Sequence, residues 1–399
     1  MNIVFVNPEY PSLSGLGHGG IATYIYNMAN ACACQGHSVH ILARNGTIPD
    51  PLQAGVQFHE FGHIAVKRPL SYLNRFRQGD IYWEQCCSKA IRKLLLRLHS
   101  VQPVDIVEVP EYGGLAHELS GTLPFPIVIH FHTPTQLIDN LNATHPSRHR
   151  KRFHAFEKKA CLKAHAFKSP SYALRQYVHT RMGIPDRQIT VIPTLMSTDE
   201  FDCIEKTKPD EDRIEILFAG RLERRKGAEL LVQATDDILN IDARIHLTIA
   251  GETELSASNS YRDALERAPS PQNRGRLWIL GPLDRKQVLT LYCRSSIFLM
   301  LSPFENAPNA LLEAMSARLP IITTDGGGNV ECITHRRNGL VFPSTDKALL
   351  IDHIRELIAD PCCARKFAGQ AYEDVKTIYN PQTVAQKTIT FYRKVAQAA

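Results

Sequence analysis

The feature that most constrains the fold of this 399-residue chain is an alternation of short apolar runs with helical stretches, which occurs twice. Continuous valine-, isoleucine- and leucine-rich runs between helices are typical of parallel strands covered on both faces. The expected strands are Ile3–Asn7, His37–Ala43, Ile106–Val109, Ile127–His132, Ile214–Ala219, Arg244–Ala250, Leu277–Leu280, Ile297–Leu301 and Pro320–Thr323. The expected helices are Gly20–Cys34, Ala228–Leu239, Arg285–Cys293 and Asn309–Ala317. Two such series predict two doubly wound α/β domains.

The predicted seam between the domains lies near Pro193–Arg213. Within it, Thr207–Arg213 is polar and has no periodic apolar residues, as expected of a linker. Asp210 and Asp212 form a D-x-D pattern, which binds metal in one class of enzymes. In a charged linker the pattern is better explained as solvated surface. Because ligands of open α/β sheets bind beyond the carboxyl ends of strands, the chemistry is expected on loops that follow strands.

Composition excludes several functions. The net charge of +6 and the pI of about 8.7 suit an anionic ligand or membrane surface, and nothing in the chain resembles a nucleic-acid-binding motif. No apolar run approaches the ~18 residues of a transmembrane helix, and the N-terminus is predicted to be a strand, which favours a cytoplasmic location. The ten cysteines lack zinc-ligand spacing, so they are expected to be reduced.

The most informative segment is Ser302–Ile321, which follows an apolar strand and leads into a helix. Glu305 precedes that helix and Glu313 lies about one turn inside it. The free amides and positive dipole end of a helix N-terminus favour a diphosphate. An ordinary crossover with surface glutamates is the plainer alternative.

A basic segment, Phe218–Gly227, follows the first strand of the second series. Arg221 and Lys226 suit phosphate oxygens, one as a planar fork and the other as a compact charge. Arg224 and Arg225 are interpreted as solvated surface.

The glycine loop Gly15–Gly20 is formally G-x-G-x-x-G, which makes NADP binding the rival hypothesis. The glycines start eight residues after the strand ends at Asn7, and the second strand ends without an acidic residue. Arg44 could meet an NADP phosphate there. Gly19 and Gly20 are the candidates for close backbone approach to an anion.

Two histidines close the strand Ile127–His132. His132, nearest the strand end, is the candidate for the ligand site, whereas His130 is expected to be structural. A metal site needs a third ligand, and none is suitably spaced.

Taken together, these motifs resemble the retaining family-4 glycosyltransferases, also called glycosyl transferases group 1. The resemblance rests on Glu305 to Glu313 as Glu-x7-Glu, on Gly-Arg-Leu-x-x-x-Lys-Gly at 220–227, on the glycine loop, on Phe-His-Thr at 131–133 and on Asn-Gly-Leu-Val-Phe at 338–342. It implies a GT-B fold with an N-terminal acceptor-side domain of residues 1–195 plus 380–399 and a C-terminal donor domain of residues 205–379. In that fold the C-terminal helix crosses back onto the first domain.

The resemblance also implies a role for each matching residue. Glu313 would hold the ribose hydroxyls, Glu305 the sugar hydroxyls, and Arg221 with Lys226 the diphosphate. Main-chain amides near Asn309, Ala310 and Leu311 would assist, Gly281 to Leu283 would cradle the base, Gly19 and Gly20 would close on the phosphates, and His132 would lie near the reacting sugar.

The implied reaction is retaining and needs no metal or other cofactor. UDP-glucose is the favoured donor and GDP-mannose the next, with a saccharide or lipid-linked saccharide as acceptor, in exopolysaccharide or glycolipid synthesis. An NADP-dependent oxidoreductase and a non-catalytic sugar-nucleotide scaffold are the alternatives. One departure from the family is Thr194-Leu195, where many relatives have Asn-Gly.

The basic stretch Arg148–Lys163 carries Phe153, Phe156 and Ala160 at roughly helical spacing. Such a helix can rest on anionic lipid, which would make the protein peripheral on the inner face of the plasma membrane. Alternatively, the phenylalanine stripe packs inward and leaves a solvated basic face.

Overall fold

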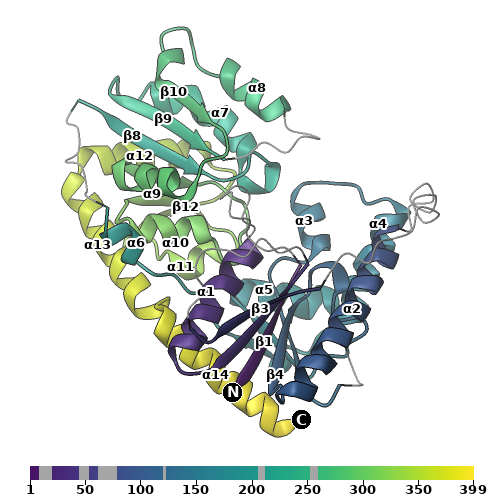
Figure 1. The fold of residues 1–399 in the computed structure, drawn as a ribbon. Helices are drawn as coiled ribbons and strands as arrows, with labels where there is room; N and C mark the ends of the chain where they lie inside the picture. Colours follow the sequence, from purple (N-terminus) through teal and green to yellow (C-terminus); the bar gives the residue numbers. More distant parts are fainter. Residues whose placement is uncertain (9–19, 45–53, 62–78, 120–122, 205–211, 252–258) are drawn as a thin grey trace. The chain divides into compact units, whose positions relative to one another are not determined.

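The computed structural model describes residues 1–8, 20–44, 54–61, 79–119, 123–204, 212–251 and 259–399. The chain divides into two compact units (Figure 1). The N-terminal unit comprises Met1–Asn140, Thr144–Leu195 and Pro381–Ala399, and the C-terminal unit comprises Leu141–Ala143 and Met196–Asn380. Each unit is an α/β fold built on a parallel sheet, as the alternation of apolar runs and helices predicts.

A seven-stranded parallel sheet forms the centre of the N-terminal unit, in the order β3-β2-β1-β4-β5-β6-β7. The strands are β1 Asn2–Asn7, β2 Ser38–Ala43, β3 Val56–Glu60, β4 Ile106–Pro110, β5 Ile127–His130, β6 Ala166–Ser169 and β7 Ile189–Val191. The helices are α1 Gly20–Cys34, α2 Gly79–Val101, α3 Thr135–Leu141, α4 Arg148–Cys161, α5 Tyr172–Tyr177 and α14 Pro381–Ala398. β1 is fully buried because helices cover both faces of the sheet.

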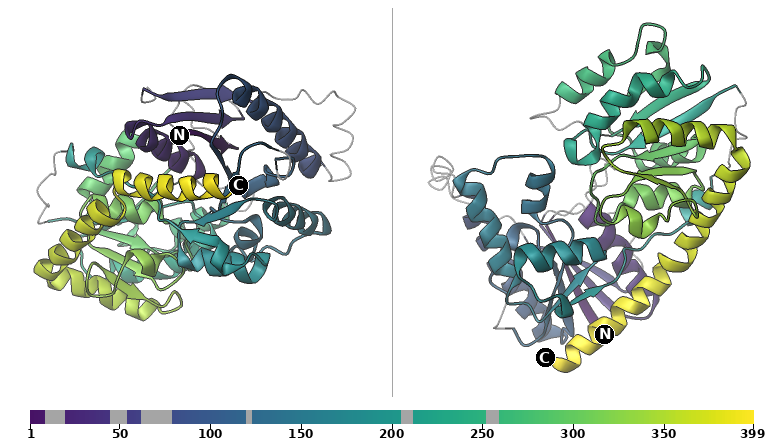
Figure 2. Two further views of the ribbon diagram at one scale, coloured as in Figure 1. Left: turned by 90° about the horizontal axis from the view of Figure 1, so that it is seen from below. Right: turned by 180° about the vertical axis from the view of Figure 1, so that it is seen from behind.

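The C-terminal helix α14 belongs to the core of the N-terminal unit. Val384, Ile389 and Tyr392 pack in one cluster with Tyr24 and Met28 of α1. Figure 2 shows the two chain ends close together on this unit, since β1 begins it and α14 completes it. The last helix therefore stabilises the first strands of the chain.

The C-terminal unit has a six-stranded parallel sheet in the order β10-β9-β8-β11-β12-β13. The strands are β8 Ile214–Ala219, β9 Ile245–Ala250, β10 Leu277–Leu280, β11 Ile297–Met300, β12 Ile321–Thr324 and β13 Leu340–Phe342. The helices are α6 Asp199–Asp202, α7 Ala228–Leu239, α8 Asn259–Arg267, α9 Arg285–Arg294, α10 Asn309–Ser316, α11 Asn329–Cys332, α12 Lys347–Ala359 and α13 Pro361–Ile378. β8 and β11 pair side by side, so the loops that follow them meet at one edge.

One of the points where the chain passes from the N-terminal to the C-terminal unit lies between Leu195 and Met196. Leu195 is buried in the core of the N-terminal unit, and the next residue, Met196, is buried in the core of the C-terminal unit. The Met196 amide donates to the carbonyl oxygen of Tyr379 at 2.9 Å, which ties the outgoing chain to the end of α13. Thr194 and Leu195 are thus packed residues in place of the Asn-Gly turn of many relatives.

Several expectations need adjustment. The strand predicted to end at His132 ends at His130, so His132 lies in the loop beyond β5. Asp210 lies outside the described residues, whereas Asp212 lies just before β8. All ten cysteines are free, as expected. Within the described part of the chain, no helix is both long and apolar enough to cross a membrane.

Candidate active site

The loop after β8 carries two of the predicted site residues. Arg221 follows the strand, and Lys226 ends a short 3-10 turn at Arg224–Lys226. Gly227 then adopts φ +85°, and a Cβ there would lie 2.2 Å from the carbonyl oxygen of Leu301. Because only glycine tolerates this geometry, the loop packs directly against the end of β11.

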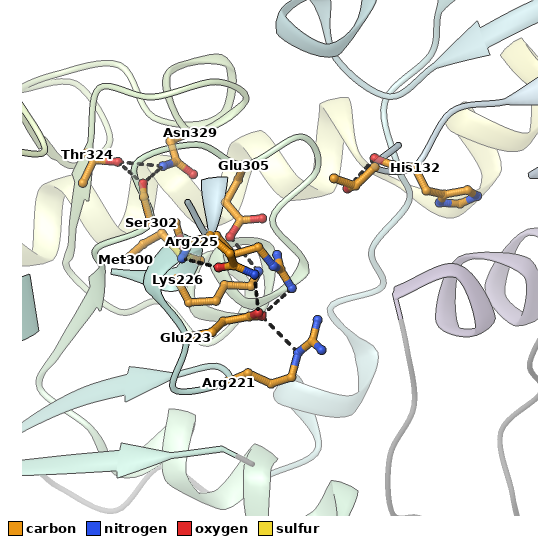
Figure 3. Close-up of polar contacts among 12 residues, drawn as sticks. His132, Arg221, Glu223, Arg225, Lys226, Met300, Ser302, Glu305, Thr324 and Asn329 are labelled. Carbon is orange, nitrogen blue, oxygen red and sulfur yellow. Dashed lines mark hydrogen bonds and ion pairs between the residues drawn. The ribbon is translucent and has the colours of Figure 1, made fainter. Parts of the chain in front are cut away.

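This packing brings Lys226 to the predicted sugar-binding glutamate. Lys226 Nζ donates to Glu305 Oε1 at 2.6 Å (Figure 3). The Lys226 side chain is 22% exposed and that of Glu305 is 9% exposed. Burial alone would raise the pKa of Glu305, but the charge and hydrogen bond of Lys226, with help from Arg225 and Ser302, lower it. Glu305 is therefore held ionised, as a hydrogen-bond acceptor.

Beside this pair lies a second ionic cluster, centred on Glu223. Glu223 is buried and pairs with Arg225 at 2.6 Å and with Arg221 at 3.3 Å (Figure 3). The prediction that Arg225 is solvated surface is wrong, because its side chain is only 10% exposed and faces Glu223. Arg224 does face solvent, with 52% exposure, and pairs with Glu229. Adjacent arginines of the turn at 224–226 therefore differ in environment, one exposed and the other buried.

The loop that holds Glu305 is clamped by three consecutive glycines after β12. A Cβ on Gly326, Gly327 or Gly328 would lie within 2.2 Å of a carbonyl oxygen in this loop. The Gly328 amide donates to the carbonyl oxygen of Glu305 at 2.6 Å. Sequence reasoning missed this support, although the run of three glycines after a strand is a visible signal of close backbone approach.

The start of the same loop is held by side chains. Thr324 Oγ1 donates to the carbonyl oxygen of Ser302, and Asn329 Nδ2 donates to the same oxygen at 3.3 Å (Figure 3). Asn329 Nδ2 also donates to Thr324 Oγ1 at 2.9 Å. All three residues are buried, so the loop is fixed at its start as well as beneath Glu305.

The N-terminus of α10 directly follows this loop. The Leu311 amide donates to the carbonyl oxygen of Pro308 at 2.9 Å, so it is already engaged. Asn309 and Ala310 precede it in the first turn, where amides have no intrahelical acceptor. Of the three amides predicted to assist a diphosphate, those of Asn309 and Ala310 fit the role and that of Leu311 does not.

Glu313, predicted to hold the ribose, pairs with Arg285 at the start of α9. Arg285 also binds Glu200 at 2.6 Å, and its side chain is 42% exposed. The loop at Gly281 and Leu283 immediately precedes α9, so the predicted base and ribose residues lie on neighbouring elements. A Cβ on Gly281 would meet no atom within 4 Å, so this position leaves open space. Sequence reasoning missed Arg285, whose partners are distant in the chain.

The N-terminal unit carries the other predicted residues. Gly19 lies outside the described residues, and Gly20 is the exposed first residue of α1. His132 is half-buried, and its ring lies 4.4 Å from that of His130 and 5.4 Å from that of Tyr24. Burial, with the neighbouring His130, holds the pKa of His132 well below its ordinary value, so its imidazole is neutral.

His130 is structural, as predicted. It is 2% exposed, and its Nδ1 lies 3.2 Å from Glu108 Oε1. Arg44, the residue that would meet an NADP phosphate, is paired with Glu84 at 2.6 Å. Among the described residues no group of three or more histidine, cysteine or acidic side chains is arranged to hold a metal ion.

The helix α4 packs its phenylalanine stripe inward. Phe153, Phe156 and Ala160 are buried, so this stripe is not a lipid-facing surface. The basic side chains of Lys151, Arg152 and other residues of α4 remain on the outer face. The alternative of an inward-packed helix with a solvated basic face is therefore the observed one.

Comparison with known proteins identifies the family. The model of glycosyl transferases group 1 matches residues 199–374, and that of glycosyltransferase family 4 matches residues 18–200. The chain is 24% identical to a glycogen synthase from Mycobacterium tuberculosis over 409 residues, covering 98% of this chain and 94% of that protein.

Solved structures agree on the architecture. Sucrose-phosphate synthase from Thermosynechococcus elongatus aligns over 100% of both chains with a TM-score of 0.75 and 18% identity. HepE from Anabaena, solved with UDP and glucose, aligns over 99% of this chain and 100% of that one, with a TM-score of 0.72 and 16% identity. The two Rossmann-like units, the strand-end loops and the two adjoining family matches together show that this chain is a GT-B glycosyltransferase of the group 1 family.

Proposed function

We propose that this glycosyltransferase transfers glucose from UDP-glucose to a saccharide or lipid-linked saccharide acceptor, with retention of anomeric configuration and without a metal ion. The observation that carries the proposal is the placement of the Lys226–Glu305 ion pair and of Arg221, which pairs with Glu223, on the loops that follow the adjacent strands β8 and β11. Arg221 is 47% exposed, so its guanidinium is accessible to a ligand.

The charges suit the chemistry of a diphosphate leaving group. Cleavage of the anomeric bond leaves additional negative charge on the diphosphate. Arg221, Lys226 and the first amides of α10 are preorganised donors that stabilise this charge as it develops. Removing one such donor typically costs ~2.7–4 kcal/mol of transition-state stabilisation. With two cations in place, the leaving group does not depend on a metal ion.

The state of Glu305 suits the holding of a sugar. Its lowered pKa and its ion pair with Lys226 keep the carboxylate ionised. An ionised carboxylate accepts hydrogen bonds from hydroxyl groups but cannot act as a general acid. Glu305 is thus proposed to orient the hydroxyls of the transferred sugar, and Glu313, held by Arg285, those of the ribose. His132, neutral and at a strand end, is proposed to act near the reacting centre.

The donor assignment draws on the structural relatives. HepE, with the same architecture, was solved with UDP and glucose and also with UDP-glucose. A starch synthase of the same fold was solved with ADP and acarbose. The HepE complexes support a glucose donor, so UDP-glucose is proposed first and GDP-mannose second.

The acceptor side is proposed to face an anionic surface. A groove of about 630 Å³ is lined by Lys89, Arg92, Lys93 and Leu96 of α2, by His117 and Glu118, and by Lys163 after α4. Burial lowers the pKa of His117, the charge of Glu118 opposes this shift, and Lys159, Lys163 and Lys89 add to it. Such a groove suits phosphate groups of a lipid-linked acceptor or of the inner leaflet of the plasma membrane.

The first experiment measures thermal stabilisation by UDP, GDP, ADP and NADP, with EDTA present throughout. A ligand at a hundredfold its dissociation constant stabilises by ~2.7 kcal/mol, which shifts Tm visibly. UDP is expected to give the shift, and Arg221→Ala to abolish it, whereas Arg224→Ala serves as the exposed-arginine control. A shift with GDP alone would instead select GDP-mannose.

The same samples are then used to measure turnover. Release of UDP from UDP-glucose in the presence of EDTA and an oligosaccharide panel tests metal-independent transfer, and the NMR coupling at the new anomeric centre tests retention. A shift with NADP alone, or transfer that needs an added divalent cation, contradicts the proposal. UDP binding without turnover on any acceptor would favour the scaffold alternative.

A further inference from the structure

Two buried glutamates accept hydrogen bonds from the segment at residues 132–135, which carries His132. Glu111 Oε2 accepts the amide N–H of His132 at 2.9 Å. Glu157 Oε2 accepts the amide N–H of Thr135 at 3.2 Å, and its Oε1 accepts the Thr135 hydroxyl at 2.6 Å. Both ends of the segment are therefore fixed by carboxyl groups that belong to other elements.

The two glutamates belong to one connected structure. Glu111 follows β4, and two residues later the amide of Gly113 donates to Glu157 Oε1 at 3.0 Å. Gly113 has φ +72°, a conformation that favours glycine, so the turn is built to reach Glu157. Glu111 is 1% exposed and Glu157 is 2% exposed, which removes both from solvent screening.

Ion pairing does not neutralise this pair within the part of the chain that the structure describes. Among the described residues, neither Glu111 nor Glu157 forms an ion pair with a lysine, arginine or histidine, and Glu111 Oε1 is buried without a hydrogen-bond partner. The basic groups on neighbouring elements are engaged elsewhere: Arg150 pairs with Asp139 at 2.7 Å, and Arg44 pairs with Glu84 at 2.6 Å.

The remaining titratable neighbours do not supply positive charge either. They are Cys161 of α4, which lies near both glutamates, and Tyr177 of α5, which lies near Glu157. Arg150 contributes only a weak attraction to Glu157. Two carboxylates without a cation in a low-dielectric site cannot both ionise, so one or both are neutral.

We infer that Glu111 and Glu157 are positioning residues, with at least one of them protonated, that fix the segment at 132–135 and thereby place His132 for glycosyl transfer. The inference rests on the role of His132 in the proposed function. The two carboxyl groups would affect transfer by binding the backbone amides of His132 and Thr135, without contacting the sugar.

The protonation behaviour agrees with this geometry. Burial, together with the charge of Glu157, raises the pKa of Glu111 to about 8, against the opposing hydrogen bond from the His132 amide. Burial likewise raises the pKa of Glu157 to about 7. The folded state thus binds more protons than the unfolded chain between the ordinary carboxyl pKa near 4.5 and about 8. Stability is therefore fully present at acidic pH and falls as pH rises through this window.

The test compares Glu111→Gln, Glu111→Ala and Glu157→Gln with the wild type. kcat and KM for UDP-glucose, and Tm, are measured from about pH 5 to about pH 9. Glu60→Gln is the matched control, because Glu60 is an exposed acid at the end of the edge strand β3 of the same unit. Glutamine keeps the acceptor oxygen for the His132 amide but cannot ionise.

The expected results separate positioning from plain stability. Wild-type kcat falls above about pH 8, where the pair ionises. Glu111→Ala loses kcat by roughly tenfold to a hundredfold at every pH, with KM for UDP-glucose changed less, because His132 is misplaced. Glu111→Gln recovers most of that loss and abolishes the alkaline fall. Its Tm exceeds that of the wild type at about pH 8, and this advantage shrinks toward about pH 5.

Two outcomes overturn the inference: a Glu111→Gln profile with the same alkaline fall as the wild type, or a Tm deficit for Glu111→Gln that does not change with pH. Failure of the proposed function has a different signature. In that case the wild type turns over no nucleotide sugar, while the pH dependence of Tm still reports on the carboxyl pair.

Discussion

The two units each contain a cluster of charged side chains near the ends of their central strands, and the two clusters differ in burial. In the N-terminal unit, Lys168 lies 2.5 Å from Glu108, and their side chains are 1% and 3% exposed. In the C-terminal unit, Lys226 lies 2.6 Å from Glu305, with exposures of 22% and 9%. Similar ion pairs therefore lie in the interior of the N-terminal unit and at a more accessible edge of the C-terminal unit.

Each charged group of the buried cluster has its partners inside the protein. Glu108 also binds the Tyr392 hydroxyl at 2.5 Å and the His130 ring at 3.2 Å, and Lys168 Nζ binds the Tyr24 hydroxyl. Burial, with the charge of Lys168, lowers the pKa of His130 to about 4, so the imidazole stays neutral. The cluster thus connects α1, three strands and α14, which explains why the last helix stays on the first unit.

The accessible cluster leaves cationic surface for a ligand. Arg221 is 47% exposed and Arg285 is 42% exposed, although each has an acidic neighbour. An ion pair at such an edge can open toward a diphosphate at little desolvation cost, whereas a buried pair cannot. Burial therefore separates the structural charges of this protein from those expected to bind substrate.

The strongest test of this difference removes the buried lysine. Lys168→Met leaves buried Glu108 with two weaker partners, the His130 ring and the Tyr392 hydroxyl. The free energy of unfolding is therefore expected to fall by about 3–5 kcal/mol. Lys226→Met, the matched change at the more exposed pair, leaves Glu305 without its ion pair but nearer to solvent, and is expected to cost less, about 1–3 kcal/mol. Urea denaturation of both variants measures the contrast, and a double variant Lys168→Met with Glu108→Gln should recover part of the loss. Equal costs for the two lysines would remove the distinction.

The accessible cluster should instead respond in catalysis. Arg221→Ala is expected to lower kcat/KM by roughly 10²–10³-fold, because one donor to the developing charge is lost. Its Tm should stay close to that of the wild type, since a change at an exposed side chain is usually worth within about 0.5 kcal/mol. Steady-state kinetics and a melting curve on one preparation measure kcat/KM and Tm of the variant and of the wild type. A variant with normal kcat/KM would place the diphosphate elsewhere.

Adjacent arginines within the accessible cluster sharpen the comparison. Arg225→Ala leaves buried Glu223 with the more distant Arg221 as its remaining ion-pair partner, and is expected to reduce the free energy of unfolding by about 2–3 kcal/mol. Arg224→Ala, next in the chain but solvent-facing, is expected to change it by less than about 0.5 kcal/mol. Chemical denaturation of the two single variants provides the measurement, and similar values for both would contradict the burial of Arg225.

A backbone test addresses the clamp beneath Glu305. Gly327 has φ +62°, and a Cβ there would lie 2.2 Å from the Glu305 carbonyl oxygen. Gly327→Ala is therefore expected to cost about 1–3 kcal/mol and to lower kcat by displacing Glu305. Gly369→Ala is the control, because that exposed glycine of α13 has open space and the change should stabilise by about 0.4–1 kcal/mol. Normal kcat in Gly327→Ala would show that the clamp does not position Glu305.

Local sequence patterns were sufficient for much of the fold. The periodicity of the apolar runs predicted both α/β units, and the positions of Arg221, Lys226 and Glu305 on loops after strands followed from it. These patterns extend over few residues. They could be interpreted from the sequence because the burial of strand faces and the start of a helix depend on residues that are near one another in the chain. Edge strand β3 was missed because it is only half-buried and lacks a continuous apolar run.

The remaining features depend on contacts between residues far apart in the chain. Lys226 meets Glu305 across 79 positions, and Tyr392 meets Glu108 across 284. Whether an arginine such as Arg225 is buried, or whether the phenylalanines of α4 face inward, depends on what packs against them. Residue type and spacing therefore determined the architecture and the positions of the chemical groups, whereas tertiary packing decided which charges are sealed and which remain accessible, because burial and pairing exist only once distant segments meet.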